Sequence, residues 1–186
     1  MRPGSPRTTG PSAHLAHEDR GLAPVLVLAV GNLLLGDDGC GQAVLAELTG
    51  MRGRWGAAVD FVDGGTQGMA LLGLVSGRRA VVVLDAVKLG AAPGTVHTLR
   101  GGEVMAAIAA RGLTAHEGNA GELLRGAALL GEMPGEVAVV GVEPEILATG
   151  IGLSAPVQAS VPAALCAATG VLDGFVSRLG QGQRMP

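Results

Sequence analysis

Hydrophobic residues in this chain form short uninterrupted runs that alternate with amphipathic stretches. The run 25–30 is apolar throughout, and its length suits a strand buried on both faces of a sheet. Similar runs predict strands at 57–62, 80–85, 95–99 and 136–142. The strand at 95–99 follows a short Pro-Gly connection, which suits an edge or antiparallel position.

Helical spacing separates these strands. Val44, Leu45 and Leu48 lie on one side of a predicted helix after the first strand. Further helices are predicted around 69–75 and at 103–110, 122–130 and 157–179. Thr66 is a candidate N-cap for the first of these helices, and Ser154 for the last. Strands that alternate with helices predict a three-layer α/β fold with a mostly parallel sheet and helices on both faces.

The length of 186 residues suits one domain, which we place at 24–180. Residues 1–23 read as a disordered tail, because they are rich in Pro, Gly, Ser and Thr and lack the apolar core of a secretory signal. Residues 181–186 read as a short C-terminal tail.

Composition argues against several classes of function. The net charge is −3 and aromatic residues make up 2% of the chain, which argues against binding to nucleic acid or to an anionic membrane surface. No apolar run reaches the roughly 18 residues of a membrane-spanning helix. Two cysteines are too few for a disulfide framework, so a reducing cytoplasm is expected, with Cys40 and Cys166 as small core residues.

Two adjacent carboxylates, Asp37 and Asp38, stand between the first strand and its helix. One aspartate can cap the helix, but an N-cap position needs only one side chain. The second carboxylate is therefore a candidate for chemistry. In open α/β sheets ligands bind beyond the carboxyl ends of the strands, where this segment lies.

Asp38, Asp85 and His116 all follow strands or precede helices, and parallel strands would bring them to one rim. Two carboxylates and an imidazole form a mixed O/N donor set that suits a divalent metal with open coordination positions. We expect them in a shallow pocket, with Asp38 near the surface. The alternatives are a turn role for Asp85 and a helix-start role for His116.

Other chemistries fit less well. Neither the dinucleotide pattern G-x-G-x-x-G nor a P-loop is present, and Asp37 and Asp38 would repel a phosphate. Cys40 as a nucleophile would need His116 as its base. The stretch 63–68 is glycine-rich and is interpreted first as a turn, then as a rim that binds substrate backbone.

Taken together, these motifs resemble the hydrogenase maturation proteases, which trim the C-terminus of the large subunit of [NiFe] hydrogenases. The resemblance runs from about residue 25 to 179. It rests on segments that match in order: 31–41 (GNLLLGDDGCG), 63–69 (DGGTQGM), Asp85-Ala86, Pro93-Gly94-Thr95, His116 and 141–144 (GVEP).

The resemblance implies a twisted sheet of about five strands and a site in which Asp38, Asp85 and His116 face nickel. The nickel belongs to the substrate, so binding here is weak and transient. The partner would be the hydrogenase large-subunit precursor, and the activity would be endopeptidase cleavage of its C-terminal extension. Substrate-binding candidates within the matching motifs are Asn32, Asp37, Asp63, Gly64, Gly65 and Thr66.

Two alternatives stay open at this point. The chain would act as an escort if it bound the precursor without cutting it. A nucleotide-dependent oxidoreductase is a more distant alternative, which binding of NAD or FAD would support.

Overall fold

A five-stranded sheet forms the centre of the structure, a computed structural model that describes residues 22–110 and 120–182. The strand order is β2-β1-β3-β5-β4. The strands are β1 (Val25–Val30), β2 (Val59–Gly65), β3 (Ala80–Ala86), β4 (Val96–Arg100) and β5 (Glu136–Val142). β4 pairs antiparallel with β5 at one edge, and the other pairings are parallel, as the sequence predicts.

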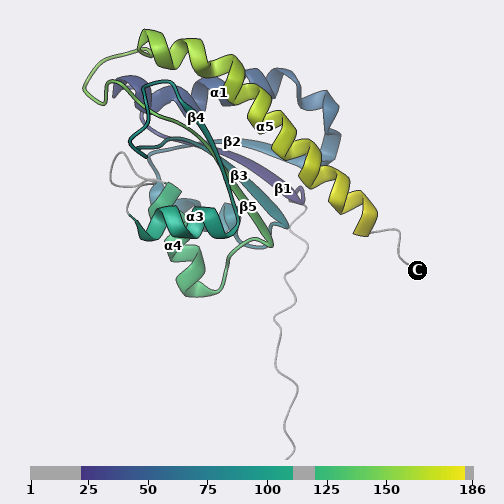
Figure 1. Cartoon of the computed structure of the whole chain (residues 1–186). Coiled ribbons are helices and arrows are strands. Elements are labelled where there is room, and N and C mark those ends of the chain that lie inside the picture. The colour runs from purple at the N-terminus through teal and green to yellow at the C-terminus, as the bar shows by residue number, and fades with distance from the viewer. Residues whose placement is uncertain (1–21, 111–119, 183–186) are drawn as a thin grey trace, which may run out of the picture.

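Helices cover both faces of this sheet (Figure 1). The helices are α1 (Cys40–Gly50), α2 (Leu72–Val75), α3 (Gly102–Ala109), α4 (Ala120–Leu130) and α5 (Ala155–Gly182). α1 and α5 lie on one face, and α3 and α4 lie on the other (Figure 1). Short 3₁₀ turns complete the chain: η1 (Gly36–Gly39), η2 (Arg52–Arg54), η3 (Gly56–Ala58) and η4 (Gly68–Leu71). The predicted three-layer α/β fold is confirmed.

Strand β1 shows why the sheet needs two helical layers. All six of its residues are buried, and they alternate between two hydrophobic clusters. Val25, Val27 and Ala29 pack with the residues of α1 and α5, whereas Leu26 and Leu28 pack with those of α3 and α4. Because successive side chains point to opposite faces, an uninterrupted apolar run is what a central strand requires.

Some boundaries differ from the prediction. β2 begins at Val59 and not at residue 57, because Ala57 belongs to the turn η3. It also continues through Gly65, into the stretch 63–68 that is predicted as a turn. Thr66 does not cap a helix, since η4 begins after Gln67 and has no side-chain cap. Residues 1–21 and 183–186 lie outside the described residues, so for these positions the predicted tails stay predictions, whereas α5 continues to Gly182, two residues into the predicted C-terminal tail.

Helix α5 passes a length and composition test for a membrane span, with a mean hydropathy of 1.5 over a window in Ala155–Gln181. The described residues include one such helix, and 39% of its window is buried. Its apolar positions Val157, Val161, Ala164, Ala168 and Val171 recur at helical spacing and pack in the sheet's core cluster. The apolar face of α5 therefore has a partner inside the domain.

The start of α1 lies directly against the carboxyl ends of β1 and β3. A Cβ added at Gly41 would lie 2.5 Å from the carbonyl oxygen of Leu84 and 3.1 Å from that of Val30. Only glycine allows this approach, because both contacts are with backbone atoms that cannot move aside. The close packing holds the η1–α1 segment at the edge where ligands bind in such sheets.

Gly41→Ala is therefore expected to lower stability by about 1–3 kcal/mol through overpacking. For a domain of this size the melting temperature should fall by about 2–12 °C. Gly73→Ala is the matched control, because nothing lies within 4 Å of a Cβ at that position. Equal melting temperatures for the two variants in thermal unfolding would contradict the assigned packing.

Candidate active site

The loop after β1 folds back so that Asp38 lies beneath it. Gly31 has a φ of +139°, and a Cβ there would lie 2.0 Å from the carbonyl oxygen of Asp38. The backbone N–H of Asn32 donates to Asp38 Oδ2 at 2.8 Å. The side chain of Asp38 is consequently buried, with 5% of its surface exposed. The expectation that Asp38 lies near the surface is wrong, because the loop covers it and α1 packs closely behind it.

Asp85 stands near the end of β3, next to β1 in the sheet. It is 3% exposed. Its Oδ1 accepts a 2.8 Å bond from the backbone N–H of Ala86, whereas Oδ2 is buried and has no hydrogen-bond partner among the described residues. Burial raises the pKa of Asp85 well above its usual range, and the neighbouring Asp38 carboxylate raises it further. The structure thus brings two of the three predicted ligands together.

His116 lies outside the described residues, so its place relative to this pair stays a prediction. The described chain resumes at Ala120, whose backbone amide partly offsets the raised pKa of Asp85 and so lies close to that carboxylate. Within the described residues no group of three His, Cys, Asp or Glu side chains is placed to hold a metal ion.

Asp37 has a different environment from Asp38. It is fully buried and joins the η1 turn to the loop after β5. Oδ2 accepts bonds from the N–H groups of Glu145 and Ile146 at 2.9 and 2.8 Å and from the Ser154 hydroxyl at 2.8 Å, and Oδ1 accepts one from the Ser154 N–H at 2.6 Å.

These donors also set the protonation of Asp37. Burial alone would raise the pKa of its carboxyl, but the donors outweigh that effect and hold the pKa below its usual value. Neither aspartate caps α1, whose N-cap is Gly39. The Ser154 hydroxyl also donates to Asp37, so the Asp37 side chain fixes the loop after β5. The role of Asp37 in substrate binding stays a prediction beside this structural one.

The remaining substrate-binding candidates lie at the same edge of the sheet. The N–H of Gly31 donates to the carbonyl of Gly65 at 3.0 Å, which joins the ends of β1 and β2. Gln42 Nε2 donates to the carbonyl of Gly31 at 3.0 Å and to Asp63 Oδ1 at 3.3 Å. Gly64 is buried and Thr66 is exposed. Their roles in binding stay predictions.

Sequence reasoning missed one carboxylate at this edge. Glu143 follows β5, and its oxygens accept bonds from the N–H groups of Leu89 and Gly90 at 2.9 and 3.1 Å. His97 Nε2 lies 3.3 Å from Glu143 Oε2. Glu143 therefore fixes the loop between β3 and β4. The sequence offered a signal for this residue, because Glu143 directly follows a buried strand, and Asp85 likewise stands near the end of one.

The two cysteines differ. Cys40 is buried, and its burial and the carboxylates of Asp85, Asp38 and Asp37 raise its thiol pKa far above the usual value. It is thus a poor nucleophile at neutral pH. Cys166 is exposed on α5, so its predicted place in the core is wrong. The helix turns that position away from the sheet, whereas Ala164 and Ala168 face it.

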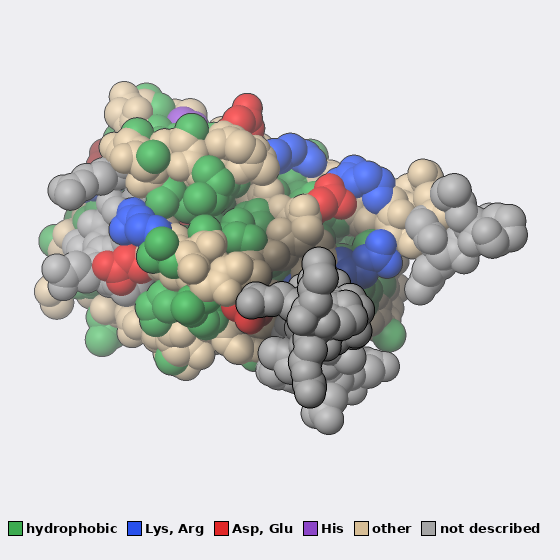
Figure 2. All heavy atoms as spheres, turned by 90° about the horizontal axis from the view of Figure 1, so that it is seen from below, with side chains coloured by type: hydrophobic (Ala, Val, Ile, Leu, Met, Phe, Trp, Pro, Cys, Tyr) green, Lys and Arg blue, Asp and Glu red, His purple; other side chains and the backbone are tan. Residues whose placement is uncertain are grey.

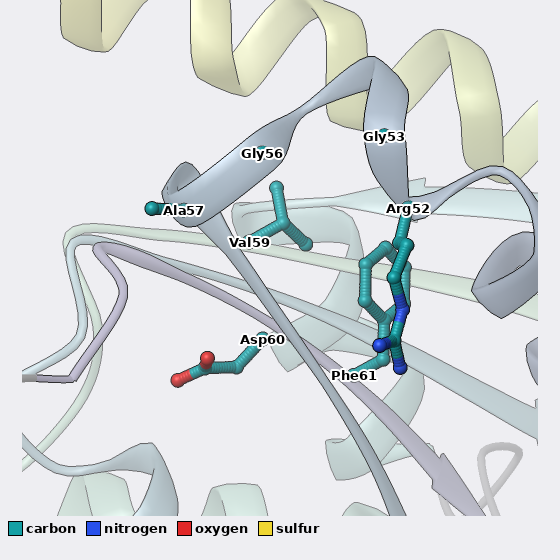
Figure 3. A pocket seen from close by; sticks show the side chains of 7 residues that line it. All are labelled: Arg52, Gly53, Gly56, Ala57, Val59, Asp60 and Phe61. Atoms are coloured by element: carbon teal, nitrogen blue, oxygen red, sulfur yellow. The ribbon is translucent and has the colours of Figure 1, made fainter.

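A cavity of about 410 Å³ lies away from the carboxylates. Figure 3 shows its lining, which comes from the turns after α1 and the first half of β2: Arg52, Gly53, Gly56, Ala57, Val59, Asp60 and Phe61. Because Val59 pairs with Val25 at the start of β1, this cavity is at the amino end of the strands. It is therefore separate from the Asp38–Asp85 pair.

Comparison with known proteins decides the family. The family model described as hydrogenase maturation protease matches residues 44–171. The chain belongs to the hydrogenase maturation protease family. It is 38% identical over 149 residues to the hydrogenase expression/formation protein HupM of Azotobacter chroococcum, a match that covers 80% of this chain and 71% of that one. It is 37% identical to the hydrogenase 2 maturation protease of Escherichia coli, covering 76% and 85% of the two chains.

Solved structures agree with this assignment. The hydrogenase maturating endopeptidase HybD from Escherichia coli superimposes with a TM-score of 0.70 at 33% identity, covering 81% of this chain and 92% of that one. HybD of Thermococcus kodakarensis gives a TM-score of 0.63 at 29% identity, covering 79% and 97%. These relatives are named as proteases or endopeptidases, which hydrolyse peptide bonds. Their fold matches the five-stranded α/β fold of this chain.

The environment of the cysteines predicts their reactivity in this maturation protease. In the native chain at neutral pH, Ellman's reagent should modify one thiol, Cys166, because Cys40 is buried and protonated. In denaturant it should modify two. Peptide mapping identifies the labelled site, and rapid native labelling of Cys40 would contradict the buried placement.

Replacing Asp37 tests its structural role. Asp37→Ala leaves three N–H groups and one hydroxyl without their acceptor, and it should lower the free energy of unfolding by about 3 kcal/mol or more. Urea unfolding measures the change. Glu47→Ala, an exposed acidic position on α1, is the control and should shift stability by less than about 0.5 kcal/mol. A comparable effect of both variants would refute the role of Asp37.

Proposed function

We propose that this chain is an endopeptidase that removes a C-terminal extension from the nickel-loaded precursor of a [NiFe] hydrogenase large subunit. The observation that carries the proposal is the buried Asp85 Oδ2, which has no hydrogen-bond partner among the described residues and lies beside Asp38. A buried carboxylate oxygen without a donor is costly unless a cation or proton approaches it. The family supplies the reaction class.

In this proposal the nickel is part of the substrate and serves as the recognition element. Asp38, Asp85 and His116 would contact it from this chain, and carboxylate and imidazole ligands suit a divalent ion of this class. Three protein ligands leave coordination positions for the groups that the precursor supplies. Such binding is weak enough for the product to leave after cleavage.

The hydrolytic step needs a positioned water molecule. Either Asp38 or Asp85 would hold that water and accept its proton, while the substrate's nickel would polarise the scissile carbonyl. Asp85 begins with a raised pKa and Asp38 accepts a backbone N–H, so the two carboxylates are not equivalent. Groups whose environments differ in this way are suited to separate roles.

We also place this reaction in the cytoplasm. Both cysteines are free, which fits a reducing compartment. The escort role remains the competing candidate, and it differs from the proposal in predicting a complex without a product.

Incubation with purified precursor tests the proposal. Nickel-loaded precursor should lose the mass of a C-terminal peptide, measured by intact-protein mass spectrometry, and nickel-free precursor should stay whole. Asp38→Asn and Asp85→Asn should each slow processing by about 100-fold or more. Both variants should stay folded, because a buried amide carries no charge to desolvate.

Glu47→Gln is the control and should process at the original rate. Equal cleavage of loaded and nickel-free precursor would remove the sensing role. A stable complex that yields no product at any enzyme concentration would favour the escort role.

A further inference from the structure

Four large apolar side chains are exposed on the two loops that Asp37 joins. Leu33 and Leu34 in the loop after β1 are 56% and 60% exposed, and Ile146 and Ile151 in the loop after β5 are 50% and 89% exposed. These four residues are called the apolar rim. Isolated exposed leucines are ordinary, but a cluster beside a proposed active site indicates a binding surface.

The two loops form one unit although they are far apart in the sequence. The N–H of Gly150 donates to the carbonyl of Leu34 at 2.9 Å, and the N–H of Gly36 donates to the carbonyl of Gly150 at 2.9 Å. Asp37 adds its own N–H to the carbonyl of Ile146 at 3.0 Å. The rim is therefore held in place before any partner arrives, which reduces the ordering cost of binding.

The apolar rim is also continuous with the carboxylates. Leu33 lies against Gly39, since a Cβ added to that glycine would be 3.1 Å from a Leu33 methyl carbon. Gly39 directly follows Asp38, and Asn32, just before Leu33, donates its N–H to Asp38. The apolar rim therefore borders the loop that covers Asp38.

Charge and size indicate what the rim binds. In the two loops, residues 32–36 and 145–154, Glu145 is the one charged residue, so the surface suits an apolar segment and not an acidic or basic one. A stable dimer normally needs about 20–30 residues from each side. Four side chains on two short loops fall well below that, which favours a transient partner over a second copy of this chain.

A second group of exposed apolar side chains lies on the layer formed by α3 and α4. Figure 2 shows hydrophobic side chains gathered on the face that carries α3 and α4. The exposed residues there include Leu129 and Leu130, which are 82% and 62% exposed at the end of α4. They lie at the opposite end of α4 from Ala120, the residue close to Asp85, so they serve as the comparison surface.

We propose that the apolar rim is the docking surface for the precursor and binds an apolar segment of that polypeptide next to the bond that is cut. This inference rests on the proposed function, because it takes the precursor as the partner. It assigns Leu33, Leu34, Ile146 and Ile151 a role in substrate affinity and not in the chemical step.

The test uses Leu34→Ser and Ile151→Ser, with Leu129→Ser as the matched control. All three positions are well exposed, so the variants should fold normally. Each rim variant should weaken binding of nickel-loaded precursor about tenfold, from the loss of one partly buried aliphatic side chain. It should raise KM by a similar factor and leave kcat unchanged, whereas Leu129→Ser should match the original chain.

Binding is compared by calorimetry with every chain, the control included, carrying Asp85→Asn, so that cleavage is slowed and the loss of this proposed nickel ligand is common to all measurements. Unchanged affinity in both rim variants, or a fall in kcat at constant KM, would overturn the docking proposal. Failure of the original chain to bind the precursor would also overturn it. So would a dimer of the original chain, seen in analytical sedimentation, that the rim variants convert to a monomer. If the original chain binds through the rim but never cuts, the docking surface stands and the proposed endopeptidase activity falls.

Discussion

The hydrogen bonds of the Asp37 carboxylate are the constraint on which the rest of the site depends. The side chain is buried, and its two oxygens take up donors from both ends of the loop after β5. A buried carboxylate without such donors would be strongly destabilising. With them, it fixes the η1 turn, and the neighbouring Asp38 takes its position from that turn.

The order of the strands in the sheet determines where Asp38 and Asp85 lie. Because β1 and β3 are adjacent and parallel, their carboxyl ends bring Asp38 and Asp85 to one edge, and the absence of a side chain at Gly41 lets α1 lie closely against it. The two carboxylates then face a shared electrostatic problem, since each disfavours the charge of the other. On the proposed function, a divalent ion carried by the precursor would relieve that repulsion.

Much of this arrangement could be predicted from the sequence. The strands were visible as apolar runs, and β5 begins and ends where the run 136–142 does. The convergence of Asp38 and Asp85 followed from the rule for parallel strands. The burial of Asp38 could not be predicted, because it depends on a backward fold of the loop at Gly31. The partners of Asp37 could not be predicted either, since they are three backbone N–H groups and the Ser154 hydroxyl of a loop more than 100 residues further along the chain. The exposure of Cys166 was missed because an alanine-rich helix does not reveal which side faces the sheet.

The distance along the chain between Asp37 and its partners has a consequence for the synthesis of the protein. The donors lie 108, 109 and 117 residues further on, and β5 is inserted between β3 and β4, which precede it in the chain. A nascent polypeptide therefore carries Asp38 long before the groups that position it have left the ribosome, and contacts so remote form late in folding. The segment that carries Asp38 therefore lacks its fixing contacts until residues 145–154, which supply those donors, have been synthesised.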